Sequence, residues 1–251
     1  MTFFRFVILA GIVISARVPA LASGASHHWS YSGHSGPAHW AQLDSHFATC
    51  GAGKAQSPID IQTHDVQPAS LPPLVFRYQP SALHIVDNGH TIQVNYDPGS
   101  ALLIAGKRYE LVQFHFHRPS EEKIDGKPFD MVAHLVHRDA KGALAVVAVP
   151  LGPGRANALV ETLWKNLPKK EQETTRKDVR INAASLLPEA RGYYTYSGSL
   201  TTPPCAQGVR WLVLKSPSTL SSHEIATFAA RYPNNARPTQ LLNGRHVLSS
   251  K

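Results

Sequence analysis

Two histidines stand two residues apart in the stretch Gln113 to Glu122, which reads QFHFHRPSEE. Alternating histidine and phenylalanine are typical of a buried strand, whose side chains point to two faces in turn. His115 and His117 therefore share one face, about 6.6 Å apart along the strand. Burying imidazoles costs free energy unless their nitrogens find partners. One metal ion bound by each ring at about 2.0–2.1 Å would provide the partner.

A third ligand must come from a neighbouring strand, and the segment AHLVH offers His134 and His137. Because they are three residues apart, only one of them can face the site. His134 shares its face with Val132 and Val136, and His137 lies on the other; alternation alone leaves the choice open. Three neutral histidines with an open fourth position are typical of catalytic zinc. Such zinc lowers the pKa of a bound water to about 7.

A hydroxide at such a metal needs a group that orients it. In the stretch GSLTTPPC, the hydroxyls of Thr201 and Thr202 precede two prolines. A threonine hydroxyl can accept a hydrogen bond from the hydroxide while donating one to a carboxylate. Glu121, four residues after His117, is a candidate for that carboxylate.

Short strands separated by turn signals must position these residues. We expect strands at 74–78, 83–87, 91–96, 101–105, 109–117, 131–137, 144–150, 193–197 and 209–214. Residues 157–167 predict an amphipathic helix with Ala158, Leu159, Leu163 and Leu167 facing inward, and residues 221–232 predict a second helix. Closely spaced strands with short turns favour a mainly antiparallel sheet.

Residues 1–22 have the features of a secretory signal peptide: a basic start, an apolar run and the small residues of Ala20-Leu21-Ala22. The apolar run is too short to span a bilayer. Removing Arg5 and Arg17 with this segment lowers the formal net charge from +8 to +6. No basic run carries interleaved aromatic residues, which argues against nucleic acid as a partner. In an exported chain the two cysteines, Cys50 and Cys205, predict one disulfide.

With these residues in place, the chain resembles the α-class carbonic anhydrases, specifically their exported bacterial branch. The motifs that carry the resemblance span the mature chain in order and are WSY (29–31), GPAHW (36–40), QSPIDI (56–61), NGHT (88–91), QFHFHRPSE (113–121), AHLVH (133–137) and GSLTTPPC (198–205). The resemblance implies a single catalytic domain, residues 23–251. Its fold would be mainly β (α+β), with a large twisted, mostly antiparallel central sheet and a few short peripheral helices.

The resemblance also implies an activity, the reversible hydration of carbon dioxide to bicarbonate and a proton by zinc-bound hydroxide. It assigns roles to the following residues: His115, His117 and His134 as zinc ligands, Thr201 and Glu121 as the pair that orients the hydroxide, and His90 as the proton shuttle. It places Thr202, Val136, Val146, Leu200 and Trp211 around the substrate, Tyr31, Asn88 and Gln93 along a water-filled cavity, and Gln113 beside a ligand histidine. His137 would be a buried structural residue, and Cys50 and Cys205 lie where exported members form their disulfide.

One position departs from the family pattern. The family normally has a glutamate two residues before the third ligand, and this chain has Val132 there. Losing such a partner typically costs 10–100-fold in metal affinity or activity. The sequence therefore predicts an active enzyme that holds zinc less tightly than its relatives, unless another group or a water replaces the carboxylate.

Two other functions share part of this pattern. A cupin-like metal barrel would use Glu121 as a direct ligand, but Arg155 stands where its last histidine should follow Pro150-Leu151-Gly152. A catalytically silent binding module on the anhydrase fold would be expected to lack ligand histidines. The resemblance further implies inhibition by sulfonamides and anions and a possible homodimer. The signal peptide implies a periplasmic or extracellular location, and the sequence shows no other membrane segment, which predicts no stable membrane insertion.

Overall fold

The structure, a computed structural model, describes residues 28–251, so the predicted signal peptide lies outside the described residues. The strands are β1 (Asp60–Ile61), β2 (Gln67–Ala69), β3 (Leu74–Arg77), β4 (Ser81–Asp87), β5 (Ile92–Asn95), β6 (Ala101–Ile104), β7 (Lys107–His117), β8 (Lys123–Ile124), β9 (Lys127–Pro128), β10 (Met131–Arg138), β11 (Leu144–Pro153), β12 (Glu173–Ile181), β13 (Tyr193–Ser199), β14 (Gln207–Leu214), β15 (Ser218–Leu220) and β16 (Leu248–Ser250). The α-helices are α1 (Trp40–Leu43), α2 (Thr49–Ala52), α3 (Ala158–Lys165) and α4 (Ser222–Arg231).

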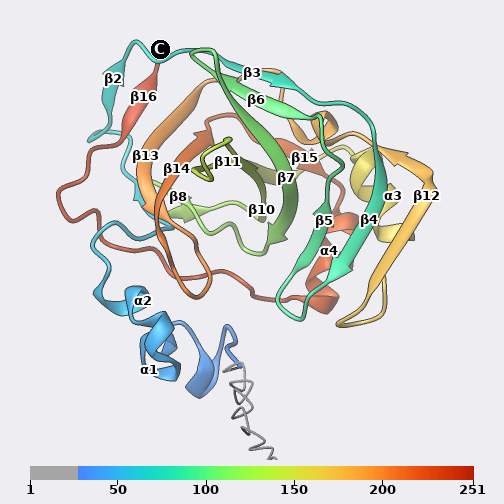
Figure 1. The fold of residues 1–251 in the computed structure, drawn as a ribbon, viewed down its shortest axis with the longest axis horizontal. Coiled ribbons are helices and arrows are strands. Elements are labelled where there is room, and N and C mark those ends of the chain that lie inside the picture. The colour runs from blue at the N-terminus through green and yellow to red at the C-terminus, as the bar shows by residue number, and fades with distance from the viewer. Residues whose placement is uncertain (1–27) are drawn as a thin grey trace, which may run out of the picture.

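Most strands form one strongly twisted 13-stranded sheet (Figure 1). Its main path runs β12-β4-β5-β7-β10-β11-β14-β13-β16-β2. The central neighbours β5, β7, β10 and β11 pair antiparallel, whereas β11 pairs parallel with β14 and β15, and β16 with β2. A mainly β fold with a mostly antiparallel central sheet is therefore confirmed, with a few short helices at its periphery.

The helices α3 and α4 cover one face of the sheet, beside β4, β5 and β12 (Figure 1). Phe116 of β7 contacts Trp164 of α3 and Phe228 of α4, with ring centroids 5.3 and 6.2 Å apart. Asn157 caps α3 with its side chain, and Ser221 and Glu224 form a capping box at the start of α4. The predicted inward face of α3 is only partly correct, because Leu159 and Leu163 are buried but Ala158, its first residue, is exposed.

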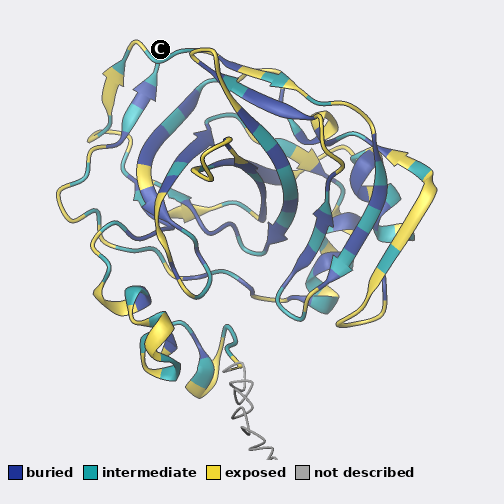
Figure 2. Ribbon diagram, viewed as in Figure 1, coloured by how far each residue is buried: buried dark blue, intermediate teal, exposed yellow. Residues whose placement is uncertain are grey.

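The central strands are largely buried (Figure 2), and their apolar side chains form two clusters, one on each face. Phe114 and Phe116 belong to the larger cluster, under the helices, as the alternation predicts. Val132 and Trp211 belong to a second cluster, on the face of β10 that carries His134. The edge strand β12 is largely exposed (Figure 2). Within residues 28–251, no helix is long and apolar enough to cross a membrane.

Candidate metal centre

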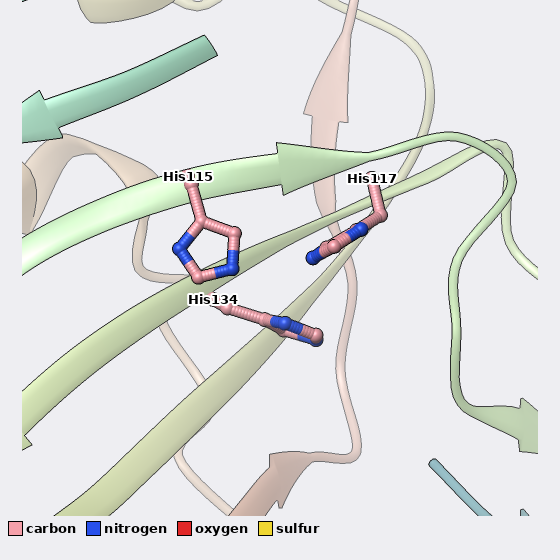
Figure 3. A group of neighbouring side chains, drawn as sticks. All are labelled: His115, His117 and His134. Carbon is pink, nitrogen blue, oxygen red and sulfur yellow. The ribbon is translucent and has the colours of Figure 1, made fainter. Parts of the chain in front are cut away.

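Three histidines converge on one face of the sheet (Figure 3). In the pairing of β7 with β10, His134 lies directly opposite His115, and Val132 lies opposite His117. Cross-strand partners share a face, so this register brings the three imidazoles together. One nitrogen from each ring lies within 4.8 Å of the others. His117 and His134 are buried, and His115 is partly buried.

The register brings His134, and not His137, next to His115 and His117. The pairing of β7 with β10 shifts at a bulge between Val136 and His137. The His137 ring lies away from the other three, with Nε2 2.6 Å from the Tyr78 hydroxyl and Nδ1 3.3 Å from the carbonyl oxygen of Ala145. The structure thus places His137 as a fully buried residue with protein partners on both ring nitrogens.

Each converging imidazole has one nitrogen already engaged by the protein. The Gln113 side-chain oxygen lies 2.8 Å from Nδ1 of His115, and the Asn235 carbonyl lies 2.7 Å from Nδ1 of His117. These acceptors place a proton on Nδ1 and leave Nε2 with a lone pair. Within residues 28–251, Nε2 of His117 is buried with no hydrogen-bond partner. A buried nitrogen of this kind needs a partner that the protein does not supply.

The third imidazole is oriented from its other side. Both carboxylate oxygens of Glu122 lie close to Nε2 of His134, at 3.1 and 3.2 Å. Nδ1 of His134 is therefore the nitrogen that is free to face the other two rings. Sequence reasoning did not find Glu122 or Asn235. The missing glutamate at position 132 signalled that a substitute was needed, but it did not say where.

Electrostatics keep two of the rings neutral. Burial, with the nearby His134, lowers the pKa of His115 to about 3. Burial, with His134 and His115, lowers the pKa of His117 well below its usual value. Burial also lowers the pKa of His134, but the carboxylates of Glu122 and Glu121 outweigh it and the net shift is upward. Three convergent imidazoles, two of them held neutral and one backed by a carboxylate, form a donor set that suits zinc.

Glu121 lies beside the three rings on the loop after β7. Its Oε1 accepts a hydrogen bond from the Arg237 amide at 2.8 Å, and its Oε2 lies 3.8 Å from Nδ1 of His134. Burial raises the pKa of this carboxyl to about 7, although several neighbours, including the Thr201 hydroxyl, lower it. Thr201 is buried on the loop that follows β13, and Thr202 is partly buried next to it. Thr201 therefore lies near enough to Glu121 for the predicted hydrogen bond between them.

An apolar row runs across three strands next to the histidines. Val136 of β10 pairs with Val146 of β11, which pairs with Trp211 of β14. Trp211 packs edge-on against His134, with ring centroids 4.9 Å apart, and Leu200 packs against the same cluster. The structure thus brings together the four residues predicted for the substrate wall.

His90 occupies the turn between β4 and β5, partly buried. Asn88 shapes this turn, because its side chain accepts hydrogen bonds from the His90 and Thr91 amides at 3.0 and 2.9 Å. Burial and the nearby His28 lower the pKa of His90, against the raising effect of Glu171. The histidine shares a hollow of about 490 Å³ with Asn88 and Glu171.

Gln93 and Tyr31 complete the predicted polar set. Gln93 of β5 pairs directly with His115 of β7, and its amide donates to Asn95 at 2.8 Å. The ring of Tyr31 lies 6.5 Å from that of His90. Its hydroxyl is buried with no hydrogen-bond partner within residues 28–251. Burial, with Glu121, raises the pKa of that hydroxyl well above its usual value.

A disulfide joins Cys50 to Cys205 across a sequence separation of 155. Cys205 lies four residues after Thr201, and its amide donates to the Thr202 carbonyl at 2.8 Å. The predicted disulfide therefore links α2 to residues 200–206, the loop that carries Thr201 and Thr202 and is called the threonine loop below.

Fold and site together define a mainly β protein in which three histidines converge and could hold a metal ion. Residues 35–251 match the eukaryotic-type carbonic anhydrase family. A carbonic anhydrase of Nostoc is 44% identical over 96% of this chain and 92% of its own. The α-carbonic anhydrase of Thermovibrio ammonificans, solved with sulfanilamide, is 42% identical with a TM-score of 0.86, covering 90% of this chain and all of its own. Dioscorin, solved with ascorbate, is 30% identical with a TM-score of 0.82, covering 88% and 97%.

The chain belongs to the eukaryotic-type, or α-class, carbonic anhydrase family, and it is an enzyme of that class. This membership excludes the cupin-like barrel. Enzymes of the family are zinc metalloenzymes, which agrees with the donor set of the three histidines.

Proposed function

We propose that this protein catalyses the reversible hydration of carbon dioxide to bicarbonate and a proton, with zinc held by His115, His117 and His134. The observation that carries the proposal is the arrangement of the three rings. Each has one nitrogen engaged by Gln113, Asn235 or Glu122, and the remaining nitrogens face one another. Zinc at this position would supply a Lewis acid that lowers the pKa of a water molecule to about 7.

Glu121 and Thr201 would orient the attacking oxygen. The Arg237 amide fixes one oxygen of Glu121, and the other is free to accept a hydrogen bond from the Thr201 hydroxyl. A hydroxyl that donates to Glu121 keeps only acceptor lone pairs for the reacting group. Thr201 would therefore accept a hydrogen bond from that group and hold its oxygen toward the substrate.

The apolar row would hold carbon dioxide, which has no charge and accepts hydrogen bonds weakly. Val136, Val146 and Trp211 line one side, and Leu200 packs against them. Thr202, next along the threonine loop, would contact the bicarbonate product. An apolar surface beside polar donors binds substrate loosely and releases the charged product to water.

Proton release would use His90. An imidazole with a pKa near or below its usual value of about 6.5 can take up and release a proton near neutral pH. Asn88 fixes the turn that carries it, and Tyr31 and Gln93 are polar groups between this turn and the histidines. The half-buried ring remains in reach of buffer.

We also propose that the protein is exported, with residues 1–22 as signal peptide and residues 23–251 as the catalytic domain. The Cys50–Cys205 disulfide supports an oxidising compartment, periplasmic or extracellular. Sulfonamides and small anions are expected to inhibit the enzyme, because both are ligands for an open metal position.

The test is the acidification of carbon dioxide solution by zinc-loaded protein, followed by stopped flow with an indicator. We expect one zinc per chain, rapid acidification and suppression by sulfanilamide. A protein with full zinc occupancy and no hydration would instead be a silent binding module, and the proposal would be wrong.

A further inference from the structure

Among residues 28–251, the carboxylate of Glu122 has one hydrogen-bond partner, the imidazole of His134. Both oxygens lie within 3.2 Å of Nε2 of His134, and the two side chains are 4% and 1% exposed. No other hydrogen bond to this carboxylate is found among residues 28–251. A buried carboxylate is costly unless it is paired, so each of these groups satisfies the other.

The backbone on both sides of Glu122 is fixed. On one side, the Ser120 hydroxyl donates to the Glu122 carbonyl at 2.7 Å and accepts from the Phe129 amide at 2.8 Å. On the other side, Lys123 begins β8, which pairs in parallel with β1. The carboxylate is therefore presented to His134 by a loop that is held at both ends.

Glu121, the preceding residue, has a different hydrogen-bond partner. Glu121 is bonded to the Arg237 amide and lies 3.8 Å from Nδ1 of His134, on the opposite side of the ring. Two consecutive carboxylates thus flank one imidazole, and only Glu122 lies within hydrogen-bond distance of it. Position 132, two residues before His134, has an apolar side chain and lies in the cluster with Val146 and Trp211.

We propose that Glu122 is the positioning residue of the metal centre. It accepts the Nε2 proton of His134, which fixes the tautomer with a lone pair on Nδ1, and it thereby slows the loss of zinc. The inference rests on the proposed zinc site. It means that this chain has moved the carboxylate that steadies its third ligand from β10 to the loop after β7, so that Val132 carries no penalty in zinc retention.

The experiment measures zinc release from full-length, zinc-loaded protein into excess chelator. Glu122→Ala removes the carboxylate, and Glu122→Gln keeps its size and one acceptor oxygen without the charge. We expect release about 10–100-fold faster in the alanine variant, with the glutamine variant between it and the wild type. Glu161→Gln, on the exposed face of α3, is the matched control and should release zinc like the wild type.

Imidazole ¹⁵N NMR of the zinc-loaded proteins reports which nitrogen of His134 carries the proton. This signal would not change if Glu122 only supported the fold. In the wild type the His134 ring should carry its proton on Nε2, and that proton should exchange with water faster in Glu122→Gln. If the alanine variant does not fold, the glutamine variant decides. The inference is overturned if folded Glu122→Gln releases zinc within twofold of the wild-type rate and its Nε2 proton exchanges as in the wild type. A wild type that binds no zinc overturns the proposed function itself.

Discussion

The imidazole of His90 stacks face to face on the indole of Trp29, with ring centroids 3.6 Å apart and an angle of 8° between the planes. The indole covers one face of the imidazole. Burial, with the nearby His28, lowers the pKa of His90. With a lowered pKa, His90 is neutral near pH 7 and ready to take up a proton. Trp29 therefore holds the proposed shuttle in place and is part of the cover that buries its ring.

Trp29→Ala should raise the pKa of His90 toward about 6.5, because the ring loses its apolar cover. The acid limb of the pH profile of kcat should shift to higher pH together with the pKa of His90, since a protonated His90 cannot accept a proton. NMR titration of the His90 ring checks the pKa, and His246→Ala is the control. An unchanged His90 pKa in Trp29→Ala would show that the stack does not set it.

His90→Ala should lower kcat in weak buffer by roughly tenfold or more and leave zinc content unchanged. Small imidazole buffers should restore part of the loss, because they carry the proton in place of the side chain. Stopped-flow rates at increasing buffer concentration check this. A kcat that does not depend on position 90 would assign proton release to another group.

Glu121→Gln should retain zinc and lose hydration activity by roughly 100-fold or more. The amide can still accept from Arg237, but its NH₂ group can donate to Thr201 and reverse the direction of that hydrogen bond. Zinc analysis and stopped flow on the same sample separate the two effects. Loss of zinc together with activity would mean that Glu121 supports the metal rather than the attacking oxygen.

The buried ring of His137 should make the free energy of unfolding sensitive to acid. Burial lowers its pKa to about 4, from about 6.5 in an unfolded chain. Above pH 6.5 the ring is neutral in both states, and between pH 6.5 and 4 only the unfolded chain takes up the proton, so stability falls by up to roughly 3 kcal/mol. In His137→Gln the free energy of unfolding should decline less between pH 7 and pH 5 than in the wild type. His84→Gln, at a partly exposed site, should decline as the wild type does.

Local periodicity was sufficient to predict much of the site, because strand alternation is a property of neighbouring residues. It placed His115 and His117 on one face and Phe114 and Phe116 on the other. It left His134 and His137 open, because the choice depends on how β10 pairs with β7 and on the bulge after Val136. The resemblance selected His134, and the register gives the physical reason.

Other features lay beyond pattern reasoning. The strand β12 is polar and largely exposed, so it lacks the apolar alternation that signals a strand. Glu122 follows Glu121 in the sequence with nothing to distinguish the two. Only the Ser120 turn and the pairing of β8 with β1 direct it toward His134. The expected weakness of zinc binding rested on Val132 alone and stays a prediction, which the proposed role of Glu122 contradicts.

Val132 and Glu122 together provide a test by exchange. In Val132→Glu a second carboxylate would be buried in the cluster of Val146 and Trp211, beside Glu122. We expect a loss of stability of about 2 kcal/mol or more and no slower zinc release. In the double variant, Val132→Glu is combined with Glu122→Gln, so the new carboxylate has an uncharged neighbour and His134 has no other carboxylate. Zinc release should therefore be slower in the double variant than in Glu122→Gln alone. Chelator kinetics and denaturant unfolding on all four proteins give the coupling. Slower release from Val132→Glu alone would mean that Glu122 does not fill the role, because His134 would then have lacked a carboxylate in the wild type.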